Sequence, residues 1–116
     1  MKKLDEIETK VLEETLRNLD AEEQILDINS EKPSVIHKEH KQLSFIIDGR
    51  GYAQVGDEVF EVERGCLVLF PENTKHSFLC VEGNMKLLHL HTPRIYGDED
   101  WYMLEKISDK WSKFLC

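Results

Sequence analysis

The stretch GCLVLFPENTKHSFLC, residues 65–80, decides how the rest of the chain is interpreted. Its residues 66–70 form a continuous apolar run, which is typical of a strand buried on both faces. Pro71 ends this strand because proline cannot donate a hydrogen bond to a sheet, and a polar turn follows. His76 and Phe78 then share one face of a second strand, because side chains alternate along a strand. The pattern places His76 beside a turn at the mouth of a strand, a common position for a metal ligand or a polar pocket residue.

The composition is that of one soluble globular domain with an acidic surface. The chain has 116 residues, of which 41% are hydrophobic and 33% are charged. A net charge of -8 argues against nucleic acid and against an anionic membrane surface as partners, since both attract basic proteins. No apolar run is long enough to span a membrane, and the acidic N-terminus lacks the apolar segment of a secretory signal. We therefore expect a cytoplasmic protein.

The N-terminal part predicts an amphipathic helix from about Lys3 to Leu19. Apolar residues recur there at steps of three and four, with Glu and Lys between them: Leu4, Ile7, Val11, Leu12, Leu16 and Leu19. This stripe needs a partner, which is either the rest of the domain or a second copy in a dimer. The many acidic residues nearby are interpreted as a solvated helix face.

The central part predicts short strands separated by turns, which is typical of an all-β sandwich or barrel. The Asp-Gly pair within residues 48–51 is the strongest hairpin signal, and further turns are expected at 56–57 and 82–84. The expected strands are 24–28, 35–37, 43–47, 52–55, 58–63, 66–70, 76–81 and 85–91. Three cysteines without a CxxC pair predict neither a disulfide framework nor a zinc knuckle.

The C-terminal part changes character after Pro93. The acids at 98–100 predict the start of a helix, because acidic side chains favour the positive end of the helix dipole. Residues 101–104 could instead form a last strand before a shorter helix. The expected organisation is an N-terminal helix in 1–22, a β-barrel in 23–96 and a C-terminal helical segment in 97–116, all in one domain.

The opening stretch resembles the second sequence motif of the cupin family. That motif runs Gly, five residues, Pro, one residue, Gly, two residues, His, three residues, Asn, and Gly65, Pro71 and His76 fall on it. Asn73 stands in place of the second Gly, which is a mild change because Asn tolerates a left-handed turn. Cys80 stands in place of the final Asn. The resemblance implies a cupin jelly-roll barrel.

The first cupin motif is present in degenerate form and ends at Gly49. Counting back, Gln42 takes the position of the motif's Glu, His37 that of its second His, and Val35 that of its first His. The resemblance implies a divalent metal, Zn, Ni, Mn or Fe, held by His37, Gln42 and His76, and Gln also serves as a metal ligand in cupins of uronate degradation. His40 could supply the missing ligand if its loop bends, although a solvated loop residue is the more ordinary interpretation.

Two further histidines lie on one strand at 85–91. His89 and His91 are two residues apart and therefore face the same side, with leucines on the other. They are candidates for general acid and base, since an imidazole titrates near neutral pH, or they form an ordinary hydrogen-bonded pair. Phe78 and Arg94 are the candidate substrate-binding residues, Arg94 for an anionic group.

Three functions remain open at this level. The first is a metal-dependent enzyme, an isomerase, ring-opening enzyme or oxygenase acting on a small oxygen-rich, sugar- or uronate-like molecule. The second is a non-catalytic module that binds a small molecule and whose metal site has decayed. The third is a scaffold whose helices drive dimerisation. A homodimer is expected because cupins are often dimers and the predicted first helix is amphipathic.

Overall fold

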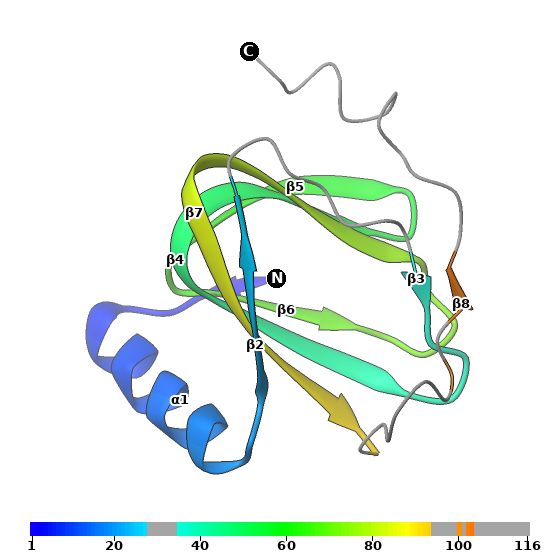
Figure 1. Ribbon diagram of the computed structural model, residues 1–116, viewed down its shortest axis with the longest axis horizontal. Coiled ribbons are helices and arrows are strands. Elements are labelled where there is room, and N and C mark those ends of the chain that lie inside the picture. Colours follow the sequence, from blue (N-terminus) through cyan, green and yellow to red (C-terminus); the bar gives the residue numbers. More distant parts are fainter. Residues whose placement is uncertain (28–34, 94–99, 101, 104–116) are drawn as a thin grey trace.

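The computed structural model describes residues 1–27, 35–93, 100 and 102–103. Its elements, drawn in Figure 1, are β1 (Lys2–Lys3), α1 (Glu6–Asn18), β2 (Glu22–Leu26), β3 (Val35–Ile36), β4 (Lys41–Val55), β5 (Glu58–Glu63), β6 (Cys66–Phe70), β7 (His76–Thr92) and β8 (Tyr102–Met103). The predicted all-β barrel with an N-terminal helix is confirmed. Within the described part of the chain, no helix is long and apolar enough to cross a membrane.

Two long antiparallel strands, β4 and β7, form the frame of the barrel. They pair with each other from Lys41↔Thr92 to Val55↔His76, and both bend on the way (Figure 1). The first half of β4 also pairs with β6, and its second half pairs with β5. On β7, the C-terminal half pairs with β2 and the first residue pairs with β3. The last residues of β7 therefore lie beside the start of β4, and the first residue of β7 lies beside β3, which precedes β4 in the chain.

The predicted hairpin at residues 48–51 is wrong, and the same holds for the turn at 82–84. Both segments lie inside continuous strands, β4 and β7, at the place where the ladder shifts register. Gly49 has a φ of 83° there, and a Cβ on it would lie 2.6 Å from the carbonyl oxygen of Asn84. Gly49 thus lies at an irregularity where the two strands bend around the corner of the barrel, and β7 continues to pair with β4 beyond the bend.

The other turn prediction and the opening stretch agree with the structure. The turn at Gly56–Asp57 joins β4 to β5, and the apolar run Cys66–Phe70 is strand β6. The strand predicted at 24–28 begins and ends earlier than predicted, since β2 covers Glu22–Leu26. At the C-terminal end Tyr102–Met103 form a strand, as the alternative interpretation predicted. Apart from these two residues and Asp100, the predicted C-terminal helix lies outside the described residues.

Helix α1 is shorter than predicted and packs on the outside of the barrel, away from β3 and β8 (Figure 1). Lys3 was expected in the helix, but Lys2 and Lys3 pair with β6 instead. Leu16 is buried against Phe45, Ile47 and Leu88, and Leu4 and Leu12 pack around them. Part of the apolar stripe therefore covers the sheet, whereas Ile7 and Val11 remain exposed.

The start of α1 is fixed by a capping box. The Asp5 side chain accepts from the backbone N–H of Glu8 at 2.8 Å, and the Glu8 side chain accepts from the backbone N–H of Asp5 at 3.2 Å. These bonds satisfy N–H groups that have no partner within the helix. The hydrogen bond from the Glu8 backbone lowers the pKa of the Asp5 carboxyl, so the cap stabilises the fold near neutral pH and is lost as the pH falls through that lowered pKa.

We expect Asp5→Ala to lower the free energy of unfolding by about 1 kcal/mol. Urea denaturation at pH 7, followed by circular dichroism, measures this change. Asp5→Asn is the matched control, because asparagine caps a helix as well as aspartate does. If the Asn variant loses as much stability as the Ala variant, the cap is not the source of the effect.

Candidate functional site

Strand pairing gathers polar side chains at one end of the barrel. Gln42 at the start of β4 lies opposite His91 near the end of β7, and Ser44 lies opposite His89. His76 is the first residue of β7, at the opposite end of that strand from His91, and it pairs with Val35 of β3. His37 follows β3 directly, so His76 and His37 lie in the same region. His37, Gln42, His76 and His89 are buried, with between 2% and 4% of their surface exposed, while His91 is half-buried.

Gln42 is the centre of this cluster. Its Oε1 lies 3.2 Å from Nε2 of His37 and 3.1 Å from Nε2 of His91. Its Nε2 donates to Oγ of Ser44 at 2.8 Å and lies 3.2 Å from Nδ1 of His89. One amide therefore joins three histidines, two through its oxygen and one through its nitrogen.

His89 determines which way the Gln42 amide points. Nε2 of His89 lies 2.9 Å from Oε1 of Gln24 on β2, and its Nδ1 lies 2.7 Å from Oγ of Ser44. Because Nε2–H donates to the Gln24 oxygen, Nδ1 is left as an acceptor and faces the NH₂ group of Gln42. The Gln42 oxygen is thereby turned toward His37 and His91. The role of His89 as a catalytic acid or base stays a prediction.

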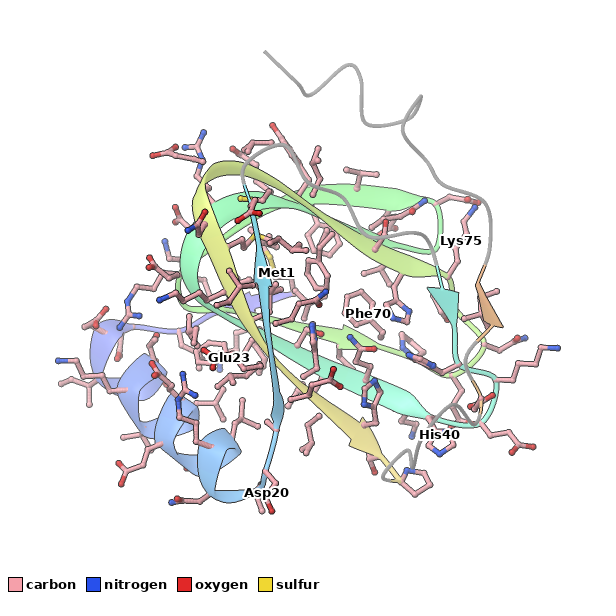
Figure 2. The ribbon with its side chains drawn as sticks, in the orientation of Figure 1. Met1, Asp20, Glu23, His40, Phe70 and Lys75 are labelled. Atoms are coloured by element: carbon pink, nitrogen blue, oxygen red, sulfur yellow. The ribbon has the colours of Figure 1, made fainter. Side chains whose placement is uncertain are left out.

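His76 lies between the polar cluster and the aromatic core. The His76 ring lies 5.0 Å from that of His37 and 4.6 Å from that of Phe70, and its Nδ1 is 3.4 Å from the carbonyl oxygen of Thr74. Phe78 has no exposed surface and packs edge-on against Phe70 at 5.5 Å. Figure 2 shows Phe70 between the strands of the barrel. Phe78 therefore lies in the core behind the polar groups, and its predicted contact with substrate stays a prediction. Arg94 lies outside the described residues.

His40 is placed at the rim of the barrel (Figure 2). The ordinary interpretation, a solvated loop residue, is wrong: His40 is 8% exposed, and its Nδ1 lies 2.6 Å from Oδ2 of Asp100. The Asp100 carboxylate also accepts from the backbone N–H groups of Lys38 and Glu39, at 2.9 and 2.7 Å. His40 is therefore held by a hydrogen bond to a carboxylate, which explains why a histidine in a loop is buried.

Asp100 is a site residue that sequence reasoning missed. Burial raises the pKa of its carboxyl, but the hydrogen bonds from His40 and from the backbone of Glu39 and Lys38 outweigh this and hold the pKa at about 2. The carboxylate is thus charged near neutral pH. The only sequence signal was an acidic run interpreted as a helix start, and the structure instead places Asp100 in a turn with a φ of 56°.

The donor atoms around Gln42 fit a divalent metal in type and spacing. Among the described residues, no three His, Cys, Asp or Glu side chains form a metal-binding group. The donor set around Gln42 instead combines two imidazoles with an amide oxygen. Two ligand atoms that share an ion at about 2.1 Å lie roughly 3.0–3.4 Å apart, and Gln42 Oε1 lies 3.2 and 3.1 Å from the two Nε2 atoms. Imidazole nitrogen suits Zn, Ni and Fe, and an amide oxygen is a harder ligand.

The surroundings of His37 point the same way. Its Nδ1 lies 2.9 Å from the backbone carbonyl oxygen of Asp100, and its Nε2 faces the Gln42 oxygen. Both partners are acceptors, whereas an uncharged imidazole carries a single N–H. If Nδ1–H donates to the Asp100 carbonyl, the Nε2 lone pair points toward the Gln42 oxygen, and a cation bound there would contact both atoms. A second nitrogen bonded to a backbone carbonyl is the usual arrangement of a metal-binding histidine.

Comparison with known proteins agrees with the barrel. A family model described as "Cupin domain" matches residues 23–92. An uncharacterised conserved protein with a double-stranded β-helix domain from Klebsiella pneumoniae superposes with a TM-score of 0.65 at 15% identity, over 72% of this chain and 72% of that one. The cupin domain of Cnp3 from Schizosaccharomyces pombe gives 0.58 at 17% identity, over 60% of this chain.

A third similar structure carries a functional description. It is described as a predicted oxalate decarboxylase from Thermotoga maritima and gives a TM-score of 0.58 at 16% identity, over 68% of this chain and 71% of that one. The match spans about half of the Cnp3 chain, 48% of its length. At such low identities the superpositions show the fold alone. No curated protein matches the chain.

Proposed function

The chain belongs to the cupin family, and from this premise we propose that it binds a divalent transition metal and, with it, a small oxygen-rich molecule. The observation that carries the proposal is the convergence of two imidazole nitrogens, from His37 and His91, on the Gln42 oxygen. A further imidazole, that of His76, lies 5.0 Å from His37 between ring centres. The proposed ligands are thus His37, Gln42, His91 and His76, with His91 in the place given to His40 by the sequence.

The ion would supply Lewis acidity toward an oxygen of the bound molecule. The chain's own residues prepare the site for this chemistry. His89 and Ser44 hold the Gln42 amide so that its oxygen faces inward, and Phe70 and Phe78 exclude water from the inner side. His91 is the most exposed of the four proposed ligands, so the opening for a small molecule is expected beside it.

Sugars, uronates and small dicarboxylates are the molecules of this class that we propose to test first. They carry several oxygens that can bind one cation, and a structurally similar protein is described as a predicted oxalate decarboxylase. The low identity to that protein means that the substrate class rests on the donor set of this chain.

A second candidate is a binding module that works without metal. The observation that favours it is the lack of a carboxylate in the donor set: among the described residues, the converging groups are imidazoles and an amide, all neutral donors. Neutral donors do not offset the charge of a divalent ion, and this weakens its binding.

The experiment that tests the proposal uses metal-free protein and two measurements. Calorimetric titration with Zn²⁺, Ni²⁺, Mn²⁺ and anaerobic Fe²⁺ is expected to give one ion per chain for at least one metal. Thermal melting with a panel of sugars, uronates and dicarboxylates is then compared between metal-loaded and chelator-treated protein. A stabilisation that requires the metal supports the proposal. An equal stabilisation after chelation favours the binding module, and failure of all four metals to bind contradicts the metal site.

A further inference from the structure

One residue, Asp100, contacts four consecutive residues of the segment that carries His37. Its backbone carbonyl lies 2.9 Å from Nδ1 of His37. Its carboxylate accepts from the N–H groups of Lys38 and Glu39 at 2.9 and 2.7 Å and pairs with Nδ1 of His40 at 2.6 Å. Both side chains of the His40–Asp100 pair are less than 10% exposed, at 9% and 8%. The contact is therefore shielded from water, unlike an ordinary surface ion pair.

These contacts continue a backbone ladder. Strand β8 begins two residues after Asp100 and pairs with β3, with Ile36 opposite Tyr102 and Val35 opposite Met103. His37 follows β3 directly, so the ladder ends where the Asp100 contacts begin. The segment around Asp100 and the segment before His37 are thus joined first by strand pairing and then by a carboxylate.

The consequence concerns the tautomer and direction of the His37 ring. Donation from Nδ1–H to the Asp100 carbonyl leaves Nε2 as the lone-pair nitrogen, and Nε2 is the atom that faces the Gln42 oxygen. The ring can reach that carbonyl only while the backbone of Asp100 stays against the 37–40 segment. Beyond the end of the β3–β8 ladder, the carboxylate holds it there, through two backbone N–H groups and His40.

We propose that Asp100 is a positioning residue for His37: its carboxylate holds the 37–40 segment so that its carbonyl fixes the His37 ring for binding a metal through Nε2. The inference rests on the proposed metal site for its function but has a readout that does not need metal. Loss of a partner of this kind typically weakens metal binding about 10- to 100-fold.

Three variants separate positioning from other effects. Asp100→Ala removes the carboxylate and is expected to weaken Co²⁺ binding about 10- to 100-fold. Asp100→Asn keeps one acceptor oxygen and suits the positive φ of 56° at this position, so an intermediate affinity is expected. Glu39→Ala is the matched control, since it removes an equal charge from the exposed side of the same segment and keeps the backbone N–H. Its affinity is expected to stay close to that of the wild type.

Two readouts are taken on each protein: Co²⁺ affinity from the visible spectrum, and the ring tautomer of His37 from long-range ¹H–¹⁵N correlation in metal-free protein. Wild type and Glu39→Ala are expected to carry the ring proton on Nδ1, and Asp100→Ala is expected to populate both tautomers. An unchanged tautomer in both Asp100 variants overturns the inference, whatever the metal result.

If the proposed metal site does not exist, the two readouts give a different combination of results from the one expected if only the positioning role of Asp100 is wrong. If the wild type binds no Co²⁺, the metal site is contradicted while the tautomer comparison still decides the positioning role. If the wild type binds Co²⁺ and both Asp100 variants bind it equally well, the positioning role is overturned and the metal site stands. Should Asp100→Ala fail to fold, Asp100→Asn provides both readouts.

Discussion

Replacing Gly51 with alanine is expected to lower the free energy of unfolding by roughly 4 kcal/mol, a large share of the stability of a small domain. A Cβ at this position would lie 1.9 Å from the carbonyl oxygen of Leu79 and 2.9 Å from its carbonyl carbon. Both atoms belong to the backbone of β7, where Gly51 pairs with Cys80, so relief requires the two long strands to separate. Urea denaturation followed by circular dichroism measures the loss.

Gly83→Asn is the control for this prediction. Gly83 also lies near the corner of the barrel, but no atom is within 4 Å of the position that its Cβ would take. Its φ of 66° is in the left-handed region, which asparagine tolerates better than most residues. A change within about 0.5 kcal/mol is therefore expected, as for most surface substitutions. Equal losses in the two variants would show that the close approach of β4 to β7 is not what requires Gly51.

Replacing His91 with alanine is expected to weaken metal binding by at least about 100-fold, more than the loss of an outer hydrogen-bond partner costs. Nε2 of His91 is one of the two nitrogens within 3.2 Å of the Gln42 oxygen. Its loss leaves one imidazole and a weakly binding amide in direct contact, with His76 farther away. Because His91 is half-buried, the fold is expected to survive the change, and calorimetric titration measures the affinity.

Ser77→Ala is the matched control for His91→Ala. Ser77 lies on the same strand and is buried, but it follows His76 directly and so points to the other face, where it donates to Oε1 of Gln54 at 3.1 Å. Its loss is expected to cost about 1 kcal/mol of stability and to leave metal affinity unchanged. If His91→Ala binds metal as tightly as Ser77→Ala does, His91 is not a ligand.

The local sequence predicted the barrel but not its corners. The apolar run 66–70 and the turn at Gly56–Asp57 are set by residues close in sequence, and both are confirmed. The Asp-Gly pair at 48–49 carries the same local signal as a hairpin, yet it lies in a bulge. What decides between the two is the pairing of β4 with β7 on both sides of the bend, between residues that are far apart in the sequence, such as Lys41 with Thr92 and Val55 with His76. Composition and spacing do not contain that information.

In the candidate site, too, local sequence predicted some residues, whereas others depend on contacts between distant parts of the chain. Motif spacing identified His37, Gln42 and His76, and the structure brings all three to one end of the barrel. Placing His91 beside Gln42 requires the register between strands 49 residues apart. The pairing of His40 with Asp100 spans 60 residues, and the acidic run around Asp100 has an equally good local interpretation as a helix start.

The central claim is that one metal ion binds at the Gln42 oxygen, and anomalous diffraction from crystals grown with Zn²⁺ tests it most directly. Data collected on both sides of the zinc edge locate the ion without reference to activity. We expect one strong peak per chain within coordinating distance of Gln42 Oε1 and of Nε2 of His37 and His91. Zinc found only on the acidic surface, with the Gln42 oxygen still hydrogen-bonded to the two histidines, would contradict the account.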